Sequence, residues 1–306
     1  MTTQAAGTGY NSGRVIVTRS GGAFVPFRVA TSTSGSGLSS TDLAALDITP
    51  TITGGSSTTT TKTNYLNYLR GDRTNEVGNS VTGGTSTYRQ RDSVLGDIVN
   101  SKAVPSAPPS RTYTDDFNPG YSTYVSDNAS RLTMVMVGAN DGMFHAFNGT
   151  VDTASASGTE IFAYVPSFVY QGPNSTPTTD GLAAYGKATS FVHHYYVDGR
   201  IAVGDVDLGK VGGTTGTVDW ATIAVGGMGK GGKGYFAVDI SDPTSFGTEA
   251  AAKKQYAVGV YRQQYGLQLR PGQVFKTAKW GWVVAFSSGY STTDTTNSTA
   301  GYVYFF

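Results

Sequence analysis

Short apolar runs of strand length, separated by turn-forming residues, dominate the chain after about residue 130. Runs bounded by glycine, serine, threonine and asparagine are typical of β-strands joined by turns. We therefore expect the chain after about residue 130 to consist of strands. Gly/Ser/Thr-rich segments punctuate the whole chain at residues 31–37, 53–63, 211–217 and 291–301.

Helical patterns are scarce, and the two clearest lie early in the chain. Residues 39–47, SSTDLAALD, predict one short helix with a serine or threonine cap. Residues 63–72 predict another helix, which ends at Gly71. Residues 89–102 are ambiguous, because Gly96 weakens a helical interpretation.

A loose repeat recurs in the second half of the chain, at residues 134–149, 222–240 and 282–306. Each copy has an apolar strand, a glycine-bearing turn and a second apolar or aromatic strand, which in the third copy follows a long Thr-rich stretch. The copies lie farther apart than the roughly 40 to 50 residues of compact propeller blades, which indicates blades with long insertions. We expect an all-β fold, a modified β-propeller, whose sheets are buried by stacking on their neighbours.

Too few copies are visible to close a ring, which takes about four to eight blades. The chain also ends on GYVYFF, a strand pattern with no turn after it. We therefore expect the propeller to be incomplete in this chain. The expected parts are residues 1–62, a Gly/Ser/Thr-rich strand segment leading into the propeller, and residues 63–306, the propeller domain, truncated at its C-terminal end.

Charge and hydropathy exclude two kinds of partner. The 306 residues carry a formal net charge of +1, and 14% are charged, with no block of five or six like charges. Such a chain has no overall field to hold nucleic acid, so nucleic-acid binding is not expected. No run of about 18 apolar residues is present, so no membrane span is expected.

The absence of cysteine excludes a disulfide framework, a thiolate zinc site and a cysteine nucleophile. The 41 glycines, 19 tyrosines and 14 phenylalanines are typical of an all-β extracellular or periplasmic protein. The first residues, MTTQAAGTGYNSG, lack the basic and apolar regions of a secretory signal. If the protein is exported, we expect its signal to lie outside this chain and Met1 not to be its natural start.

Several phrases, each weak alone, occur along the chain in one order. They are YLRGD (68–72), RQRDSVLGDIVNSKAV (89–104), VGANDGMFHAFNG (137–149), EIFAYVPS (160–167), HHYYVDGR (193–200), WATIAVGGMGKGGKGYFAVDISDP (220–243) and WVVAFSSGY (282–290). Together they resemble the C-terminal domain of the type IV pilus biogenesis and tip-adhesin proteins of the PilY1/PilC family. GRVIVTRSGGAFVPFRV (13–29) is similar to the stretch before that domain's propeller, so the resemblance covers about residues 13–306.

The resemblance implies a modified β-propeller at the cell surface or pilus tip of a Gram-negative bacterium, exported through the outer membrane. It implies a role without catalysis, in pilus assembly, in opposing retraction during twitching motility, and in cell adhesion. The implied partners are minor and major pilins at the pilus tip and a host or abiotic surface.

The family's calcium site is an acidic loop of the EF-hand-like kind, expected after the SGY-type strand and so downstream of Phe306. This chain contains no such loop, so calcium is expected in the parent protein and no cofactor is expected in these residues. The family's N-terminal half, often a von Willebrand A-like module with its own metal site, is also missing from this sequence.

Asn140, Asp141 and Gly142 lie between two apolar strands, and Asp-Gly there predicts a tight hairpin turn whose two central residues need positive φ. The side chains of Asn140 and Asp141, with one histidine, are too few ligands for calcium, which takes about six to eight oxygens. His145, flanked by phenylalanines, is expected to be packed and hydrogen-bonded, not a catalytic base. Asp198 and Gly199 also predict a turn.

The densest set of possible metal ligands contains His193, His194, Asp198, Asp205 and Asp207. Strand alternation would send the two neighbouring histidines to opposite faces, so they are not expected to serve one site. Asp205 and Asp207 can point the same way and are the weak candidates for a metal site.

The glycine-rich run 226–234 contains two lysines and invites a phosphate-loop interpretation. It lacks the spacing of that motif and continues into a strand, so a hairpin with solvated lysines is favoured. Arg70, Gly71 and Asp72 spell an integrin-recognition tripeptide, but the tyrosines and leucines before it suggest a packed segment. The tripeptide remains a candidate for adhesion.

No nucleophile elbow, catalytic triad or paired carboxylates appear in the sequence, so no catalytic residue is expected. Tyr121, Tyr124 and Tyr170 are expected to be exposed contacts for adhesion, because tyrosine offers a large contact area at low entropic cost. Two alternatives stay open. One is a quinoprotein-like propeller dehydrogenase, and the other is a structural propeller that binds carbohydrate.

Overall fold

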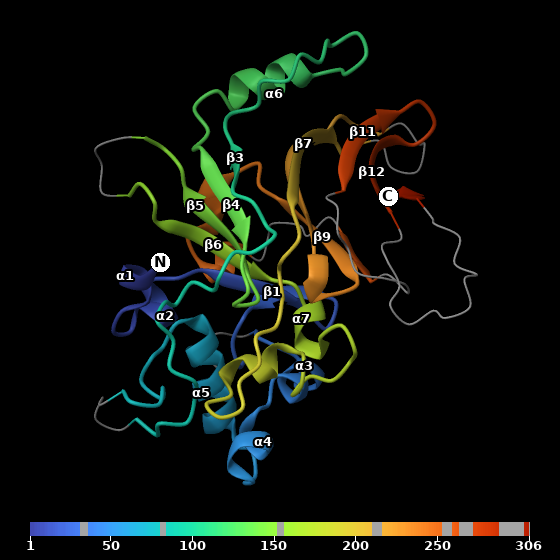
Figure 1. The fold of residues 1–306 in the computed structure, drawn as a ribbon. Helices are drawn as coiled ribbons and strands as arrows, with labels where there is room; N and C mark the ends of the chain where they lie inside the picture. The colour runs from blue at the N-terminus through green and yellow to red at the C-terminus, as the bar shows by residue number, and fades with distance from the viewer. Residues whose placement is uncertain are drawn as a thin grey trace, which may run out of the picture.

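The computed structural model describes residues 1–30, 36–79, 84–151, 156–209, 216–252, 259–262, 272–287 and 303–305. The strands of this part form three sheets, and several helices gather as a layer below the first sheet (Figure 1). The structure is mostly sheet, as expected for a modified β-propeller. Across the described ranges the three sheets do not close into a ring.

The first sheet has six strands, which are β1 (Ile16–Ser20), β2 (Ala23–Pro26), β3 (Val104–Ser106), β4 (Met134–Gly138), β5 (Phe144–Asn148) and β6 (Glu160–Val165). Strands β3 to β6 follow one another as an antiparallel meander, the arrangement of a propeller blade. Strand β1 pairs parallel to β6 and carries β2 on its other side. The hairpin β1–β2 therefore extends this blade with the N-terminal segment.

The second sheet is another antiparallel meander, formed by β7 (Ile201–Asp207), β8 (Trp220–Gly227), β9 (Gly234–Asp239) and β10 (Gly259–Arg262). The third contains β11 (Gln273–Thr277), β12 (Gly281–Ser287) and β13 (Val303–Phe305), also antiparallel. The hairpin predicted for the glycine-rich run is confirmed as the connection between β8 and β9.

Two neighbouring residues of β9 show how the sheets stack. The Phe236 ring lies 5.5 Å from that of Phe144 and 5.4 Å from that of Tyr164, centroid to centroid, so it contacts the first sheet. The Tyr235 ring lies 4.2 Å from that of Phe286, in the third sheet. Successive side chains of a strand point to opposite faces. The second sheet is therefore packed between the other two, as blades are in a propeller.

Two glycines of the repeat copies, Gly138 and Gly226, lie within strands and not in turns. Gly226 pairs with Phe236 in register, and a Cβ at Gly226 would lie 2.3 Å from Cζ of that ring. Gly138 ends β4, and a Cβ there would lie 2.4 Å from the carbonyl oxygen of Val197. Close packing, and not a turn conformation, requires glycine at both positions.

Both predicted helices are present. Helix α3 (Ser40–Ala45) begins after Ser39, whose hydroxyl accepts a hydrogen bond from the amide of Asp42. Helix α5 (Thr59–Arg70) ends at Gly71 as predicted but begins earlier, because Thr58 and Thr61 form a reciprocal capping box. The threonines at the end of the Gly/Ser/Thr-rich segment 53–63 thus form the first turn of a helix.

Several short helical segments occur where the sequence favoured none. They are α1 (Thr2–Ala5), α2 (Gly9–Ser12), α4 (Thr49–Thr53), α6 (Tyr121–Asp127), α7 (Phe168–Gln171), α8 (Glu249–Ala252) and the 3₁₀ turns η1 (Leu182–Gly186), η2 (Gly229–Gly231) and η3 (Pro243–Phe246). The expectation that only strands occur after residue 130 is therefore wrong, because short helical segments lie in the connections between those strands. Residues 89–102 form neither a helix nor a strand.

Some predictions fall outside what the structure describes. The tracts at 31–37, 211–217 and 291–301 lie mostly or wholly outside the described residues, as does part of the last repeat copy. Helix α5 runs across position 62, and the division of the chain into residues 1–62 and 63–306 stays a prediction.

Replacing Phe236 by alanine is expected to lower the free energy of unfolding by about 3 to 5 kcal/mol, because a buried ring joining two sheets is lost. Chemical denaturation followed by tryptophan fluorescence measures the change. Phe117, with 78% of its surface exposed, provides the control, and its alanine variant should unfold like the parent chain. Equal stabilities of the two variants would contradict the stacking described above.

Candidate functional site

Asn140, Asp141 and Gly142 form the connection between β4 and β5, so the predicted turn is confirmed. Its geometry differs from the prediction, because only Gly142 has a positive φ, of 91°. The amide of Ala139 donates to the carbonyl of Met143 at 2.9 Å, which closes the loop. The turn thus resembles the three-residue hairpin loop, in which a glycine follows a type I turn.

The side chains of this turn hold the segment 96–97. Asp141 Oδ2 accepts a hydrogen bond from the Gly96 amide at 3.0 Å, and Asn140 Nδ2 donates to Asp97 Oδ2 at 3.0 Å. The backbone of Asn140 also donates to the carbonyl of Asp97. A Cβ on Gly96 would lie 2.3 Å from the Asp141 amide nitrogen, so glycine is needed for this approach. Asn140 Oδ1 accepts from the amide of Tyr196 at 3.0 Å, which ties in a second segment.

Behind the turn lies a buried charge network of Arg14, Glu160, His145 and Asp141. His145 Nδ1 lies 2.7 Å from Glu160 Oε1, and its Nε2 lies 3.1 Å from Asp141 Oδ1. Arg14 Nε donates to Glu160 Oε2 at 2.6 Å. The prediction that His145 is packed and hydrogen-bonded is confirmed, because its side chain has no exposed surface.

The two carboxylates keep this histidine protonated. Burial lowers the pKa of His145, but the charges and hydrogen bonds of Asp141 and Glu160 outweigh burial and raise its pKa to about 9. Burial likewise raises the pKa of Glu160, but Arg14 and His145 hold that pKa far below its usual range. The network therefore contains two cations and two anions, so its buried charge is balanced.

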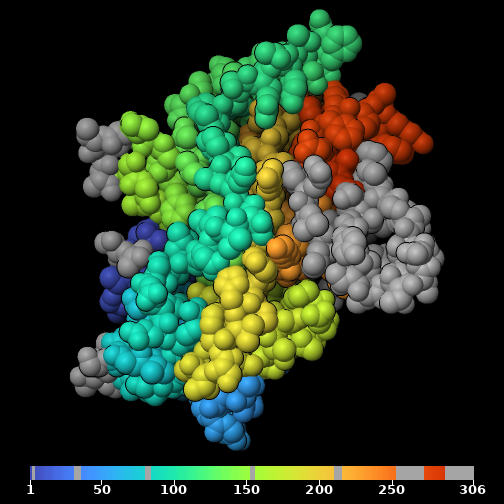
Figure 2. All heavy atoms as spheres, viewed as in Figure 1, coloured from blue at the N-terminus to red at the C-terminus, as the bar shows by residue number. Residues whose placement is uncertain are grey.

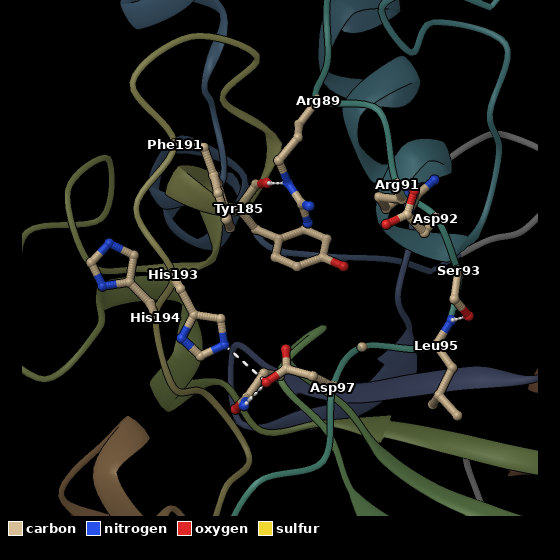
Figure 3. Close-up of a pocket in the computed structure, with 12 residues that line it drawn as sticks. Arg89, Arg91, Asp92, Ser93, Leu95, Asp97, Tyr185, Phe191, His193 and His194 are labelled. Atoms are coloured by element: carbon tan, nitrogen blue, oxygen red, sulfur yellow. Dashed lines mark hydrogen bonds and ion pairs between the residues drawn. The ribbon is translucent and has the colours of Figure 1, made fainter.

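A surface pocket of about 350 Å³ lies beside the turn (Figure 3). Residues of the segment 89–97 form one wall, and Tyr185, Phe191, His193 and His194 form the other, with Asn140 between them. Figure 2 shows the segments around residue 95 (teal) and residue 190 (yellow) side by side on this face. The turn thus holds one wall through Asp97 and lies next to the other through Tyr196.

His193 and His194 both line this pocket, but their rings point in different directions (Figure 3), so the expectation that they do not serve one site stays a prediction. They lie in an irregular segment, to which strand alternation does not apply. His193 Nε2 lies 2.9 Å from Asp97 Oδ2. Burial raises the pKa of Asp97, but the hydrogen bonds from Asn140 and His193 outweigh it and leave that pKa below its usual value. Burial lowers the pKa of His194.

The prediction that Tyr121, Tyr124 and Tyr170 are exposed is wrong. The exposed fractions of these side chains are 1%, 9% and 1%. Each hydroxyl forms a hydrogen bond with a buried partner. Tyr121 donates to Asp205, while Tyr124 and Tyr170 bond with the hydroxyls of Thr222 and Thr18. These tyrosines pack the fold and are not available as surface contacts.

The tripeptide Arg70-Gly71-Asp72 is the end of a packed helix and not a displayed loop. Arg70 is fully buried, and its Nη1 lies 2.7 Å from Glu249 Oε1. Gly71 has a φ of 117° and terminates α5, while Asp72 accepts a hydrogen bond from the amide of Thr74. Arg70 as an adhesion contact is therefore contradicted by its burial.

The weak metal candidates bind protein donors. Asp205 accepts hydrogen bonds from Tyr121 and Thr222, both at 2.7 Å, and Asp207 accepts from the amides of Gly209 and Asp219. In the ranges that the structure describes, no three His, Asp or Glu side chains lie close enough together to hold a metal ion. The calcium loop expected downstream of Phe306 stays a prediction.

Two further glycine segments have structural roles. Asp198 and Gly199 lie in an irregular bend before β7, where Asp198 Oδ1 accepts from the amide of Asn100 at 3.0 Å. A Cβ on Gly199 would lie 2.0 Å from the carbonyl oxygen of Gly227, so this bend packs directly on the β8–β9 hairpin. In that hairpin Lys230 is exposed, with its Nζ 4.9 Å from the centre of the Tyr195 ring.

The antiparallel meanders, stacked face to face, define the chain as a protein of the β-propeller class. A family model described as the PilY1 β-propeller domain matches residues 95–306. The chain belongs to this family, which confirms the resemblance seen in its phrases and the predicted fold class.

Relatives of known name support this membership. A type IV pilus biogenesis factor PilY1 homolog of Xylella fastidiosa is 39% identical over 184 residues, which cover 59% of this chain and 13% of that protein. Type IV pilus biogenesis factor PilY1 of Pseudomonas aeruginosa strain PAK is 32% identical over 229 residues, which cover 73% of this chain and 17% of that protein. This chain therefore spans less than a fifth of either relative.

A solved structure also matches, the crystal structure of the Pseudomonas aeruginosa PilY1 C-terminal domain. It has 27% identity and a TM-score of 0.40, and the match covers 60% of this chain and 31% of that chain. As for membrane insertion, none of the helices in the described ranges has the length and hydropathy needed to cross a bilayer.

Sequence reasoning missed the pocket residues Arg89, Tyr185 and Phe191. The stretch RQRDSVLGD, which begins at residue 89, was used only to recognise the family. Yet it contains several charged residues in a chain of which 14% is charged. That concentration of charge was the available signal for Arg89. No local pattern indicated that Tyr185 and Phe191 would lie opposite it.

The stability of the chain should fall as the pH rises from about 6.5 to 9. The raised pKa means that folded His145 binds its proton more tightly than the unfolded chain does, so the stabilisation is complete below about pH 6.5 and is lost as the pH passes through 9. The expected loss is up to about 3 kcal/mol. Urea denaturation at a series of pH values measures it.

A His145→Gln variant should be less stable at pH 6.5 and should lack this component of the pH dependence. His193→Gln, at a surface histidine outside the network, serves as the matched control and should keep it. A wild-type chain whose stability stays level between pH 6.5 and 9 would show that His145 is buried without its proton.

Proposed function

We propose that this chain is a non-catalytic binding domain that acts in type IV pilus biogenesis. The observation that carries the proposal is the match of the PilY1 β-propeller domain to residues 95–306. The relatives are named as type IV pilus biogenesis factors, and that role is carried here to this chain. Because the chain spans a small part of them, the proposal concerns its contribution to a larger protein.

In this proposal the protein is exported through the outer membrane and lies at the pilus tip, where it contacts pilins and a host or abiotic surface. It promotes pilus assembly and opposes retraction. Stacked sheets suit such a position, because sheets that pack face to face can bear tension as one unit. The irregular connections between strands provide the contact surfaces.

Deleting the coding sequence from the source bacterium is expected to remove surface pili, counted by electron microscopy. Immunogold labelling of the wild type, with an antibody against residues 1–306, should place gold at filament tips. Adhesion of the deleted strain, compared with that of a pilus-free strain, tests the adhesin role separately. Unchanged pili in the deleted strain, with gold confined to the periplasm, would overturn the proposal.

The same deletion in a strain whose pilus retraction is blocked separates two roles. Pili that return in this background would assign the protein chiefly to opposing retraction. Pili that stay absent would assign it to assembly. Re-expression of the full protein restores the wild-type count in either case and controls for effects on neighbouring genes.

A further inference from the structure

The pocket contains two arginines that differ in how fully they are bonded. Arg91 donates from Nε to Glu76 Oε1 at 2.7 Å, from Nη1 to the carbonyl of Tyr68 and from Nη2 to the carbonyl of Asp72. Its donors are thus engaged within the protein. Arg91 therefore shapes the wall of the pocket and is not available to a ligand.

Arg89 is bonded differently. Its Nε donates to the carbonyl of Tyr185 at 3.3 Å, and the Tyr68 hydroxyl is a side-chain hydrogen-bond partner of the guanidinium, so fewer of its donors are engaged than those of Arg91. Figure 3 shows the side chain extending from the rim of the pocket to a position above the Tyr185 ring. A guanidinium in this state offers a planar pair of donors, which matches the two oxygens of a carboxylate.

Two aromatic rings hold this guanidinium in place. Its Cζ lies 4.7 Å from the centre of the Tyr185 ring and 4.1 Å from that of Phe191. The backbone of Arg89 also donates to the carbonyl of Gly186 at 3.0 Å. Because the side chain is already ordered, little rotamer entropy remains to be lost when a ligand binds. The arrangement is that of a preorganised anion site.

We propose that this pocket binds a carboxylate carried by a peptide segment of a partner protein, with Arg89 receiving the carboxylate. The volume of about 350 Å³ lies near the lower end of ligand pockets, which suits one side chain or a chain terminus. Leu95 and the two rings provide apolar contact for the carbon atoms next to the carboxylate. This inference does not depend on the proposed role in pilus biogenesis.

The charges opposite Arg89 leave room for this ligand. The carboxylate oxygen Oδ2 of Asp97 is engaged within the protein, by hydrogen bonds with Asn140 and His193. The His193 ring points toward Asp97 from the wall of Phe191, whereas the His194 ring points away from it (Figure 3). Asp92 is exposed on the opposite wall, near Ser93, where it can accept a backbone N–H from a peptide.

The rim of the pocket favours a peptide over an acidic sugar. Ile98 and Val99 follow Asp97 directly, and their exposed fractions are 44% and 51%. Val192 precedes His193 on the other wall and is 61% exposed. An extended peptide that places its carboxylate on Arg89 can cover these apolar side chains with its neighbouring residues, whereas a sugar ring offers mainly hydroxyl groups.

The test is a titration of the isotope-labelled chain with capped tripeptides, followed by amide chemical shifts in NMR spectra. The probes are leucine-glutamate-leucine, its leucine-glutamine-leucine counterpart and glucuronate. We expect saturable shifts at the pocket residues with the glutamate peptide, and at least tenfold weaker binding of the glutamine peptide. Equal binding of the two peptides, or no binding of the glutamate peptide, would overturn the proposal. Tighter binding of glucuronate would overturn the choice of a peptide.

Variants test the role of Arg89 directly. Arg89→Gln should weaken binding of the glutamate peptide at least tenfold. Arg89→Lys keeps the charge but loses the planar pair of donors. Its affinity for the glutamate peptide should lie between that of the wild type and that of Arg89→Gln. Arg200→Gln removes an exposed arginine outside the pocket and should bind like the wild type. Wild-type affinity in Arg89→Gln would contradict the assignment. If the Arg89 variants fail to fold, the comparison of the two peptides on the wild-type chain still tests the proposal.

Discussion

The rest of the structure depends on the balance of charge in the buried network of Arg14, Glu160, His145 and Asp141. A charge removed from water is tolerated only when an opposite charge and hydrogen bonds replace the solvent. Arg14 precedes β1, Glu160 begins β6, His145 lies in β5 and Asp141 lies in the turn before β5. The network therefore holds the N-terminal segment, the blade and its turn together, because any one of them moving away would leave a buried charge without its partner.

The same turn connects this network to the surface. Asp141 binds His145 on the inside and the Gly96 amide on the outside, while Asn140 binds Asp97. Irregular segments have no ladder of hydrogen bonds of their own, so their shape depends on such contacts. The wall of the pocket that contains Asp97 is irregular chain, and its position is set by a turn that is itself held by buried charges.

The amino-acid composition does not predict which aromatic residues are buried and which are exposed. Tyrosine content is typical of adhesive surfaces as well as of cores, and the two uses cannot be told apart from spacing. Tyr121 lies in a seven-residue helix, yet its hydroxyl binds Asp205, which lies 84 positions away in β7. Arg70 is buried in the same way, by an ion pair with Glu249 that no local pattern predicts. The burial of these residues is a property of contacts between distant segments.

The amino-acid sequence by itself determined the features that depend on neighbours along the chain. Apolar runs and glycine signals predicted the strands of the repeat, the turn at Asn140 to Gly142 and the end of helix α5, because strand pairing and helix capping are decided within a few residues. The phrases in order also determined the family. Only the tertiary structure decided that residues 89–97 and 185–194 face each other across a pocket, because that arrangement depends on backbone contacts between segments far apart in the chain.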